Sequence, residues 1–496
     1  MRGPREFCFL NESGGLERGW DDDSRAKLWL YNLHYFDDLN AEGAALRDAW
    51  HVALMDDWIR EHPPGGGTGW EPYPTSLRIV NWIKRHLDGR PLSAGQRESL
   101  AVQVRWLTQR LELHLLGNHL FANAKALVMA GLLFDGAEAD RWLAKGSSIV
   151  HRELPEQVLP DGGNFERSTM YHSIFLEDLL DLINVAHAYP DPTMAASVAR
   201  WRETAGRMLS WLHALCHPDH EISLFNDAAI GIAPSPCELI AYAERLGIAA
   251  PASFDAAAIV SPNVTAFPES GYVRIENASA VALLDVAVVG PDYLPGHAHA
   301  DTLSFELSVF GRRLIVNGGT SGYGLSPDRQ RERGTAAHST VVIDGQDSSE
   351  VWGGFRVARR ARPFGLAMSA RADEAVVACS HDGYRRLSGR PVHRREWCLR
   401  AGGLRVSDKV EGGFQSAEAR YHFHPEIRVN LQGEGRLALE LHGGRQVRLQ
   451  VARGRLRTES SHYADAFGVV RDTTCAVVSL VAGPGAADAC VDVNWT

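Results

Sequence analysis

The residues of this sequence that could do chemistry gather in four short stretches. The first is Gly117-Asn118-His119, followed by Asn123 and Lys125, between two apolar segments. A carboxamide and an imidazole at the start of a helix can cap it by hydrogen bonding to its free backbone N–H groups. The same groups can also project from a turn between two helices into a cleft. The sequence leaves both interpretations open.

The second stretch covers residues 161–168 (DGGNFERS) and continues to Tyr171 and His172. A Gly-rich loop that leads into a helix needs Asn or Ser as a cap in any case. A tyrosine at the start of a helix is also ordinary core material when its hydroxyl has a partner. Glu166 and Arg167, together with Tyr171 and His172, exceed what capping requires, and we interpret the stretch as a candidate site.

The third stretch places His297, His299 and Asp301 directly before a predicted strand. In a strand, residues i and i+2 lie on one face, so the two imidazoles can point the same way. Two imidazoles and a carboxylate within five residues are poor core material and good material for a metal site. A solvated loop before the strand is the alternative.

The fourth stretch begins at Asn317, passes Tyr323 and ends at His338. Its glycines let the backbone turn sharply or approach a ligand closely. A histidine such as His338, alone at the start of a strand, is usually structural. With His299 it could complete a metal site, whose other ligands would come from Asn317, Asp301 or water.

The elements that must position these residues follow two different periods. Before residue 247, apolar residues recur three and four apart, which predicts helices, and serial helix pairs are typical of a helical ring or solenoid. The predicted helices cover residues 41–61, 75–87, 93–116, 119–134, 137–153, 172–188 and 192–217.

After residue 270 the period changes to two, which predicts strands. They cover residues 271–276, 304–310, 313–316, 339–343, 404–407, 436–441, 447–451 and 475–480. Many short strands with Gly-rich turns indicate an antiparallel sandwich. Residues 248–270 have the composition of a linker. We therefore expect an all-α domain over residues 1–255 and an all-β domain over residues 270–496.

Composition excludes several classes of function. The 51 Lys and Arg residues are outnumbered by 61 Asp and Glu, a net charge of −10, which argues against phosphate-driven nucleic-acid binding. No apolar run reaches the roughly 20 residues of a membrane span. Seven scattered cysteines without a CxxC pair indicate neither a disulfide framework nor a thiolate zinc site. The first twenty residues carry no apolar block of signal-peptide length.

Taken in order, these stretches resemble the heparinase II/III family of polysaccharide lyases. The matching segments are residues 117–123, 162–172, 296–301, 314–320 and 335–340. They occur in the family's order across most of the chain. The resemblance implies an N-terminal (α/α) toroid joined to a C-terminal antiparallel β-sandwich, in agreement with the periodicity above.

The resemblance also implies β-elimination at the uronic acid residues of an acidic polysaccharide or oligosaccharide. A base removes the C5 proton, the 4-linked sugar leaves, and an unsaturated uronate remains. By family position, Asn118 and His119 would neutralise the substrate carboxylate, with His119 also a candidate base. Tyr171 would be the main proton carrier, and His297 the base for the opposite C5 epimer. This reading requires all four side chains to converge on a single sugar.

Further residues are expected to bind substrate by the same resemblance. An unperturbed tyrosine has a pKa near 10, and Arg167 and His172 are the neighbours expected to assist Tyr171. Trp70 and Tyr73 would stack on sugar rings, and Arg78 would pair with a uronate. The expected substrate-binding set is completed by Glu71, Asn123, Glu166, Tyr293 and Tyr323.

A metal is the one cofactor that the resemblance implies. Family members with a metal in the sandwich hold it with two histidines and an aspartate, and His299 and His338 fall on the histidine positions. The aspartate position is Asn317, and a neutral amide weakens a dication site. Either zinc is lost, or it binds weakly, or Asp301 substitutes. Any zinc here is expected to be structural.

Two other functions stay open at this point. A glycoside hydrolase on a similar toroid would need two carboxylates around the scissile bond, and Glu71, Asp161, Glu166 and Asp227 are available. A non-catalytic protein of an exopolysaccharide system would bind polymer without shortening it. Relatives commonly meet substrate in the periplasm or outside the cell, which conflicts with the missing export segment. A homodimer is also expected.

Overall fold

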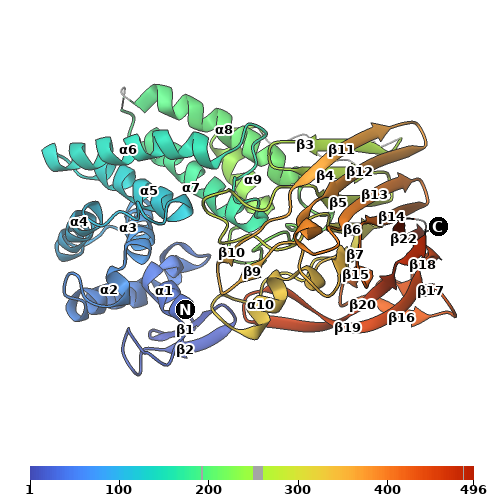
Figure 1. The fold of residues 1–496 in the computed structure, drawn as a ribbon. Coiled ribbons are helices and arrows are strands. Elements are labelled where there is room, and N and C mark those ends of the chain that lie inside the picture. The colour runs from blue at the N-terminus through green and yellow to red at the C-terminus, as the bar shows by residue number, and fades with distance from the viewer. Residues whose placement is uncertain (192–193, 250–260, 484, 496) are drawn as a thin grey trace. The chain divides into compact units, whose positions relative to one another are not determined.

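The computed structural model describes residues 1–191, 194–249, 261–483 and 485–495 (Figure 1). The chain forms two compact units, and each includes two separate segments. Unit 1 consists of Met1–Gln157 and Glu177–Glu203, and unit 2 of Val158–Leu176 and Thr204–Thr496. The two units are described separately below.

Unit 1 is built from helices around an aromatic core. A short hairpin precedes them, and Trp58 and Trp82 lie completely buried at the centre of the core. The elements are β1 (Glu6–Phe9), β2 (Glu12–Gly15), α1 (Lys27–Tyr35), α2 (Asp48–Glu61), α3 (Pro72–Leu87), α4 (Ala94–Thr108), α5 (Gly117–Leu133) and α6 (Ala137–Gln157), with most of α7 (Thr169–Ala188) and the start of α8 (Ala195–Ala214).

Helices α5 and α6 approach closely because glycines face the contact. A Cβ on Gly131 would lie 2.6 Å from the backbone nitrogen of Leu143, and one on Gly146 would lie 2.8 Å from the carbonyl oxygen of Ala124. Neither position can carry a larger residue without moving a backbone. The contact fixes the start of α5, which carries one of the candidate stretches.

The seven predicted helices are all present, but one of them ends earlier than the sequence predicted. The helix predicted over residues 93–116 stops at Thr108, and residues 109–116 form a loop. Leu116 and Gly117 both have positive φ, of 60° and 56°, and so reverse the chain before α5. Leucines in this loop imitate a helical apolar stripe, which is why the sequence pattern continued too far.

Unit 2 contains two nine-stranded sheets in which all named strands pair antiparallel. One sheet has the order β11-β12-β13-β14-β22-β18-β17-β16, with β21 beside β22. Its strands are β11 (Pro363–Ala370), β12 (Glu374–His381), β13 (Val392–Arg400), β14 (Gly403–Glu411), β16 (Arg428–Leu431), β17 (Arg436–Glu440), β18 (Gln446–Arg453), β21 (Val481–Gly483) and β22 (Ala486–Trp495).

The second sheet has the order β19-β20-β15-β7-β6-β5-β4-β3, with β8 beside β15. Its strands are β3 (Asn263–Phe267), β4 (Tyr272–Glu276), β5 (Ala280–Asp285), β6 (Phe305–Val309), β7 (Arg312–Val316), β8 (Val341–Ile343), β15 (Ala417–Phe423), β19 (Arg455–Ala466) and β20 (Val469–Ser479). Side chains from both sheets, such as Leu307, Trp397 and Val491, form one buried cluster. The sheets are therefore the two layers of a sandwich, as the sequence predicted.

The eight predicted strand segments all coincide with strands. The prediction of a linker over residues 248–270 is wrong for part of that range. Residues 263–267 of that linker form β3, which pairs with β4, while residues 250–260 lie outside the described part. The change from helix to strand falls between α9 (Pro236–Arg245) and β3. Because residues 158–176 and 204–249 pack with the sandwich, the domain boundaries at 255 and 270 stay a prediction.

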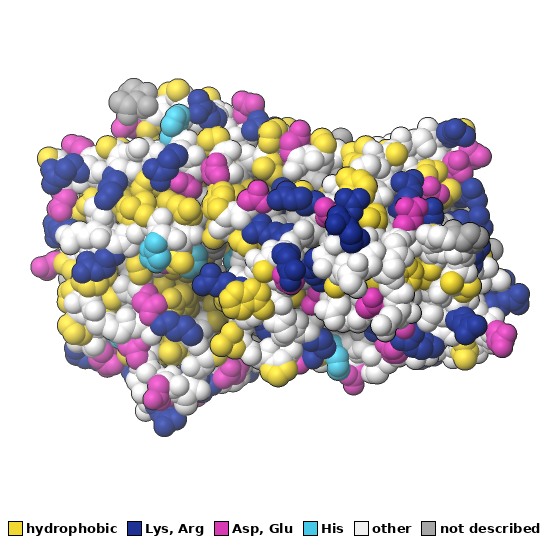
Figure 2. Space-filling model, viewed as in Figure 1, with side chains coloured by type: hydrophobic (Ala, Val, Ile, Leu, Met, Phe, Trp, Pro, Cys, Tyr) yellow, Lys and Arg dark blue, Asp and Glu magenta, His cyan; other side chains and the backbone are white. Residues whose placement is uncertain are grey.

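The surface carries both signs of charge. Figure 2 shows Lys and Arg side chains interspersed with Asp and Glu over the viewed face, as expected for a chain whose charges nearly balance. Among the described helices, none is both long and apolar enough to cross a membrane.

Candidate active site

Three of the candidate stretches meet in unit 2. Tyr171 lies in the first turn of α7, His297 in the loop between β5 and β6, and Tyr323 in the loop that follows β7. The rings of Tyr171 and His297 stand 4.0 Å apart between centroids. The hydroxyl oxygens of Tyr171 and Tyr323 are 2.8 Å apart. We call these three side chains, with Asp227 and Arg329, the tyrosine–histidine cluster.

Asp227 fixes the orientation of His297. Its Oδ2 atom accepts a hydrogen bond from His297 Nδ1 at 2.8 Å, and its Oδ1 atom one from His299 Nε2 at 2.7 Å. A carboxylate can only accept, so His297 carries its proton on Nδ1. The neutral imidazole then keeps a lone pair on Nε2. That tautomer is the one a general base needs.

Arg329 keeps Asp227 ionised. Its guanidinium, from the short helix α10 (Pro327–Arg333), binds both carboxylate oxygens of Asp227. Burial alone would raise the pKa of Asp227, but Arg329 and the two imidazoles outweigh it and hold that pKa well below its usual range. Asp227 therefore orients His297 without taking its proton. This pairing could not be predicted from the sequence, because Arg329 and Asp227 lie 102 positions apart.

Glu166 lies on the other side of the His297 ring. Its Oε2 atom is 3.7 Å from His297 Nε2, and the Glu166 side chain is almost completely buried. An imidazolium formed when Nε2 takes a proton would stand between two carboxylates. The charge of Asp227 is matched by Arg329, so Glu166 is the carboxylate whose charge faces the imidazolium. The site is thus arranged to receive a proton at Nε2.

Tyr171 is a proton donor in this environment. Burial first, and then Tyr323 and Asp227, raise the pKa of Tyr171 well above 10. The phenol is therefore protonated at neutral pH. This result corrects the expectation that neighbouring cations assist its ionisation.

The two residues expected to assist Tyr171 are engaged elsewhere. The Arg167 guanidinium donates to the carbonyl oxygens of Phe165 and Ser270. His172 is fully buried, with Nδ1 accepting from the Asn164 backbone and Nε2 facing the Met208 carbonyl. Both are structural in the unit they occupy, and His172 has no ring nitrogen left for a substrate.

A residue with positive φ stands next to each of the acidic residues Glu166 and Asp227. Arg167 and Asn226 have φ of 60° and 57°, a region that costs about 1–3 kcal/mol for residues other than glycine. The Asn226 amide donates to the Arg167 carbonyl and accepts from the His299 N–H, each at 3.0 Å. These bonds hold Glu166 and Asp227 in place through their strained neighbours.

Unit 1 holds a second group of similar composition. His119 lies in the first turn of α5, and its Nδ1 atom is 2.9 Å from Glu112 Oε1. The Tyr73 ring lies 4.4 Å from the imidazole between centroids. The N-cap position of α5 is occupied by Leu116, so neither Asn118 nor His119 is the cap. The capping interpretation is therefore wrong for both residues, and the functional interpretation stays a prediction.

Asn123 supports this group from below. Its amide donates to Glu112 Oε2 at 3.0 Å and accepts from the Glu112 N–H at 2.8 Å. Asn123 is fully buried, which contradicts its expected contact with substrate. It positions Glu112, which in turn positions His119. Sequence reasoning missed Glu112 because it lies in a stretch predicted as helix.

Most of the expected sugar groove in unit 1 is interior. Trp70 is 4% exposed and Arg78 is 0% exposed, and the Arg78 Nε atom donates to Gln103 at 2.9 Å. Arg78 therefore cannot reach a uronate, and Trp70 packs in the core. Glu71 is partly exposed and bonds to Tyr31 and Lys27.

In unit 2, Tyr293 remains open to solvent. It is 52% exposed, and its ring lies 6.2 Å from that of Phe165 between centroids. An exposed aromatic face suits contact with a sugar ring. Its expected role stays a prediction.

A third group, in unit 1, has the composition of a metal site. The ligand atoms of Asp21, His34 and His62 all lie within 4.8 Å of one another. However, His34 Nδ1 accepts a hydrogen bond from Trp58 Nε1 at 3.1 Å. Neutral His34 therefore carries its proton on Nε2, the atom that faces Asp21. A donor in that position does not fit a cation.

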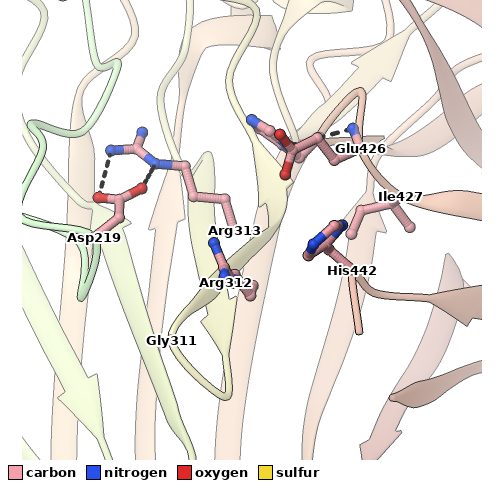
Figure 3. A pocket seen from close by; sticks show the side chains of 8 residues that line it. Asp219, Gly311, Arg312, Arg313, Glu426, Ile427 and His442 are labelled. Atoms are coloured by element: carbon pink, nitrogen blue, oxygen red, sulfur yellow. Dashed lines mark hydrogen bonds and ion pairs between the residues drawn. The ribbon is translucent and has the colours of Figure 1, made fainter. Parts of the chain in front are cut away.

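Figure 3 shows a pocket in unit 2 lined by residues outside the tyrosine–histidine cluster. The Arg313 guanidinium turns toward Asp219, with Nε 2.7 Å from Asp219 Oδ2. Glu426 and His442 lie on the opposite side, with Arg312 between. The Arg313 cation already pairs with the Asp219 carboxylate, so we assign this pocket no role in the candidate active site.

Comparison with known proteins agrees with the fold. Residues 260–496 match the family model for the C-terminal region of heparinase II/III-like proteins, and residues 94–235 match that for the heparinase II/III N-terminus. A crystal structure of heparinase III has 16% sequence identity and a TM-score of 0.73, covering 95% of this chain and 76% of that one. This likeness confirms the expected toroid and sandwich.

Two curated relatives are similar in sequence. Both are heparin-sulfate lyases, one from Bacteroides stercoris (24% identity over 245 residues) and one from Pedobacter heparinus (26% over 251 residues). Each alignment covers 47% of this chain and 36% of the relative, so the match spans about a third of each relative's length. With the two family models covering most of the sequence, the chain belongs to the heparinase II/III family.

Proposed function

We propose that this protein is a polysaccharide lyase that cleaves a uronic-acid-containing polysaccharide or oligosaccharide by β-elimination. The observation that carries the proposal is the tyrosine–histidine cluster, where a protonated phenol and an imidazole with a free nitrogen stand 4.0 Å apart. One group can donate a proton and the other can accept one. The names of the two curated relatives support the same chemistry.

The first step is removal of the C5 proton. His297 Nε2 takes this proton, because Asp227 already holds the hydrogen on Nδ1. The resulting imidazolium lies between Asp227 and Glu166. Proton transfer of this kind contributes about 10²–10⁴-fold to the rate when the base is well placed.

The second step is departure of the 4-linked sugar. The electron pair of the C5–H bond becomes the C4–C5 double bond, and the bond between C4 and its glycosidic oxygen breaks. Tyr171 gives its proton to that oxygen, which its raised pKa suits. Tyr323 Oη, 2.8 Å from the Tyr171 hydroxyl, can relay a proton from solvent to Tyr171, and His297 releases the C5 proton to solvent before the next cycle.

The substrate carboxylate needs a partner as negative charge develops on it. Asn118 and His119 are the residues proposed for this role from the sequence. Glu112 Oε1 lies 2.9 Å from His119 Nδ1 and holds the imidazole in place. The convergence of these residues with Tyr171 on one sugar stays a prediction, as do a homodimer and the cellular compartment.

The paired-carboxylate hydrolase is less compatible with the site. Asp227 is fully buried and bound to Arg329, His297 and His299. The Asp161 carboxylate accepts hydrogen bonds from the backbone and hydroxyl of Ser270. Neither carboxylate is free to protonate a leaving group or to activate water.

The proposal is tested by incubating the enzyme with a panel of uronate polymers and following the ultraviolet absorbance of unsaturated uronates. We expect at least one polymer to give this signal and Tyr171→Phe to lose most of it. The matched control is Tyr384→Phe, because the Tyr384 hydroxyl donates to the Val341 carbonyl inside the sandwich. Saturated ends would indicate hydrolysis, and an unshortened polymer would indicate a binding protein.

A further inference from the structure

Three fully buried polar side chains meet in unit 2, at the position where the family resemblance implies a metal. They are His299, Asn317 and His338. The two imidazole rings lie 5.3 Å apart between centroids. In the described part of the chain, His299 Nδ1, Asn317 Nδ2 and His338 Nε2 have no hydrogen-bond partner. Buried polar atoms without a partner are costly, and a bound metal could satisfy them if all three side chains can act as ligands.

His299 fits. Its Nε2 atom lies 2.7 Å from Asp227 Oδ1, and a carboxylate can only accept a hydrogen bond. The proton of neutral His299 is therefore on Nε2. Its Nδ1 atom keeps a lone pair, which is what a metal ligand requires.

His338 and Asn317 cannot both act as metal ligands at the same time. The His338 Nδ1 atom lies 3.3 Å from Asn317 Oδ1. If that oxygen accepts the Nδ1 proton, His338 Nε2 is free to ligate, but the amide presents its NH₂ group on the remaining side. An amide nitrogen is a donor and does not ligate a cation. The three residues then offer two ligand atoms.

Turning the amide over does not help. With the oxygen and nitrogen exchanged, Asn317 Oδ1 is free to ligate and Nδ2 donates to His338 Nδ1. Neutral His338 must then carry its proton on Nε2, and that ligand is lost. In either orientation the set provides two ligand atoms, whereas structural zinc takes four, usually with an anionic or imidazole set.

Asp301 does not replace the missing carboxylate. Its Oδ2 atom accepts a hydrogen bond from the Asn226 N–H at 3.2 Å. Among the described residues, the close groups of three histidine, cysteine or acidic side chains are limited to Asp21, His34 and His62. The donors present in the sandwich therefore do not fit a structural divalent metal.

We propose that Asn317 alone disables this metal site, with both imidazole ligands kept in place, so that Asn317→Asp converts the cluster into a zinc site. A carboxylate removes the conflict, because one oxygen accepts the His338 Nδ1 proton while the other ligates. His299 Nδ1, His338 Nε2 and the new oxygen then form a three-residue site with a negative charge. Water can supply the fourth ligand.

The test compares zinc binding by the full-length wild type and Asn317→Asp. Both are stripped with a chelator, incubated with one equivalent of zinc and desalted, and bound zinc is measured by mass spectrometry of the metal. We expect about one zinc per chain in Asn317→Asp and at least a 100-fold weaker affinity in the wild type, about 2.7 kcal/mol. Zinc should raise the melting temperature of Asn317→Asp and leave that of the wild type unchanged.

Two further variants locate the metal. Asn317→Asp combined with His338→Ala should lose the zinc, whereas Asn317→Asp combined with His62→Ala should keep it. The second combination controls for the Asp21 group in unit 1. Zinc that survives His338→Ala would place the metal elsewhere and overturn the proposal.

Other outcomes also decide the matter. A stoichiometric zinc in the wild type that His338→Ala removes would show that the amide does not disable the site. A folded Asn317→Asp with no more affinity than the wild type would show that the imidazoles are not poised to ligate. If the carboxylate variant does not fold, Asn317→Cys provides a thiolate in a smaller side chain. A folded Asn317→Cys must then bind zinc, or the proposal is wrong.

Discussion

The two units each hold a carboxylate, an imidazole and a phenol in contact, and they differ in what holds the carboxylate. In unit 1, Glu112 binds His119, and the neutral amide of Asn123 steadies it. In unit 2, Asp227 binds His297, and the cation of Arg329 pairs with it. The rings are similarly placed, with Tyr73 4.4 Å from His119 and Tyr171 4.0 Å from His297.

This difference in charge assigns different chemistry to the two groups. The charge of Asp227 is already matched by Arg329, so the pair directs the His297 tautomer without adding a net negative charge beside it. Glu112 is held by the neutral amide of Asn123, so its negative charge beside His119 is not matched by a cation in that contact. The first arrangement suits a base, and the second suits a group that neutralises a substrate carboxylate.

The largest effect is expected from Asp227→Asn. Loss of the tautomer control should lower kcat about 10³–10⁴-fold, as in other oriented histidines. The unpaired Arg329 should also lower the free energy of unfolding by about 3–5 kcal/mol. The matched change in unit 1, Glu112→Gln, leaves no buried cation unpaired. If Glu112→Gln is equally costly to kcat and to unfolding, the contrast between the units is wrong.

His297→Ala and His119→Ala separate the two roles. We expect His297→Ala to lower kcat about 10²–10⁴-fold with little change in KM. His119→Ala should act more on KM, because the imidazole is proposed to bind the carboxylate. Steady-state kinetics on one uronate polymer measures both. An equal fall in kcat with unchanged KM in the two variants would assign His119 to proton transfer as well.

The pH dependence of stability should also differ between groups. The folded-state pKa of Asp227 lies below its unfolded value, so its contribution is present above pH ~4 and is lost as the pH falls further. The pKa of Tyr171 is raised, so its contribution is present below pH ~10 and is lost as the pH rises through the folded value. Chemical denaturation across pH measures both limbs. Tyr171→Phe should flatten the alkaline limb alone, and an unchanged alkaline limb would contradict the burial of this phenol.

The smallest effect is expected from Tyr293→Ala. An exposed ring that contacts one sugar should change kcat/KM by a few-fold, about 1 kcal/mol of stacking, without affecting the melting temperature. Its counterpart in unit 1 is Asn123→Ala, which leaves a Glu112 oxygen without a partner and costs about 1–3 kcal/mol of stability. Thermal unfolding distinguishes the two variants, because we expect a lower melting temperature in Asn123→Ala alone. A large loss of stability in Tyr293→Ala would assign that ring to packing.

The sequence predicted the fold class, because helical and strand periods report burial directly. The expectation that Tyr171 and His297 lie together rested on the family resemblance, and Tyr323 was expected only to bind substrate. Sequence reasoning missed β5, in which all six residues are buried, since a strand covered on both faces shows no alternation. It also missed Glu112 and the link from Arg329 to Asp227. These partners are set by packing between distant segments, and spacing along the chain carries no signal for them. For Arg78 the prediction was wrong in the opposite way. This residue was expected to bind a uronate, but its guanidinium stacks on Trp58 inside the core.

The most direct test of the account is mass analysis of the products that the wild type and His297→Ala release from an accepted uronate polymer. We expect the wild type to give oligosaccharides with a C4–C5 double bond, lighter by one water than hydrolysis products. His297→Ala should give almost none while it keeps the fold and melting temperature of the wild type. Unsaturated products formed equally fast by a folded His297→Ala would contradict the role of the tyrosine–histidine cluster.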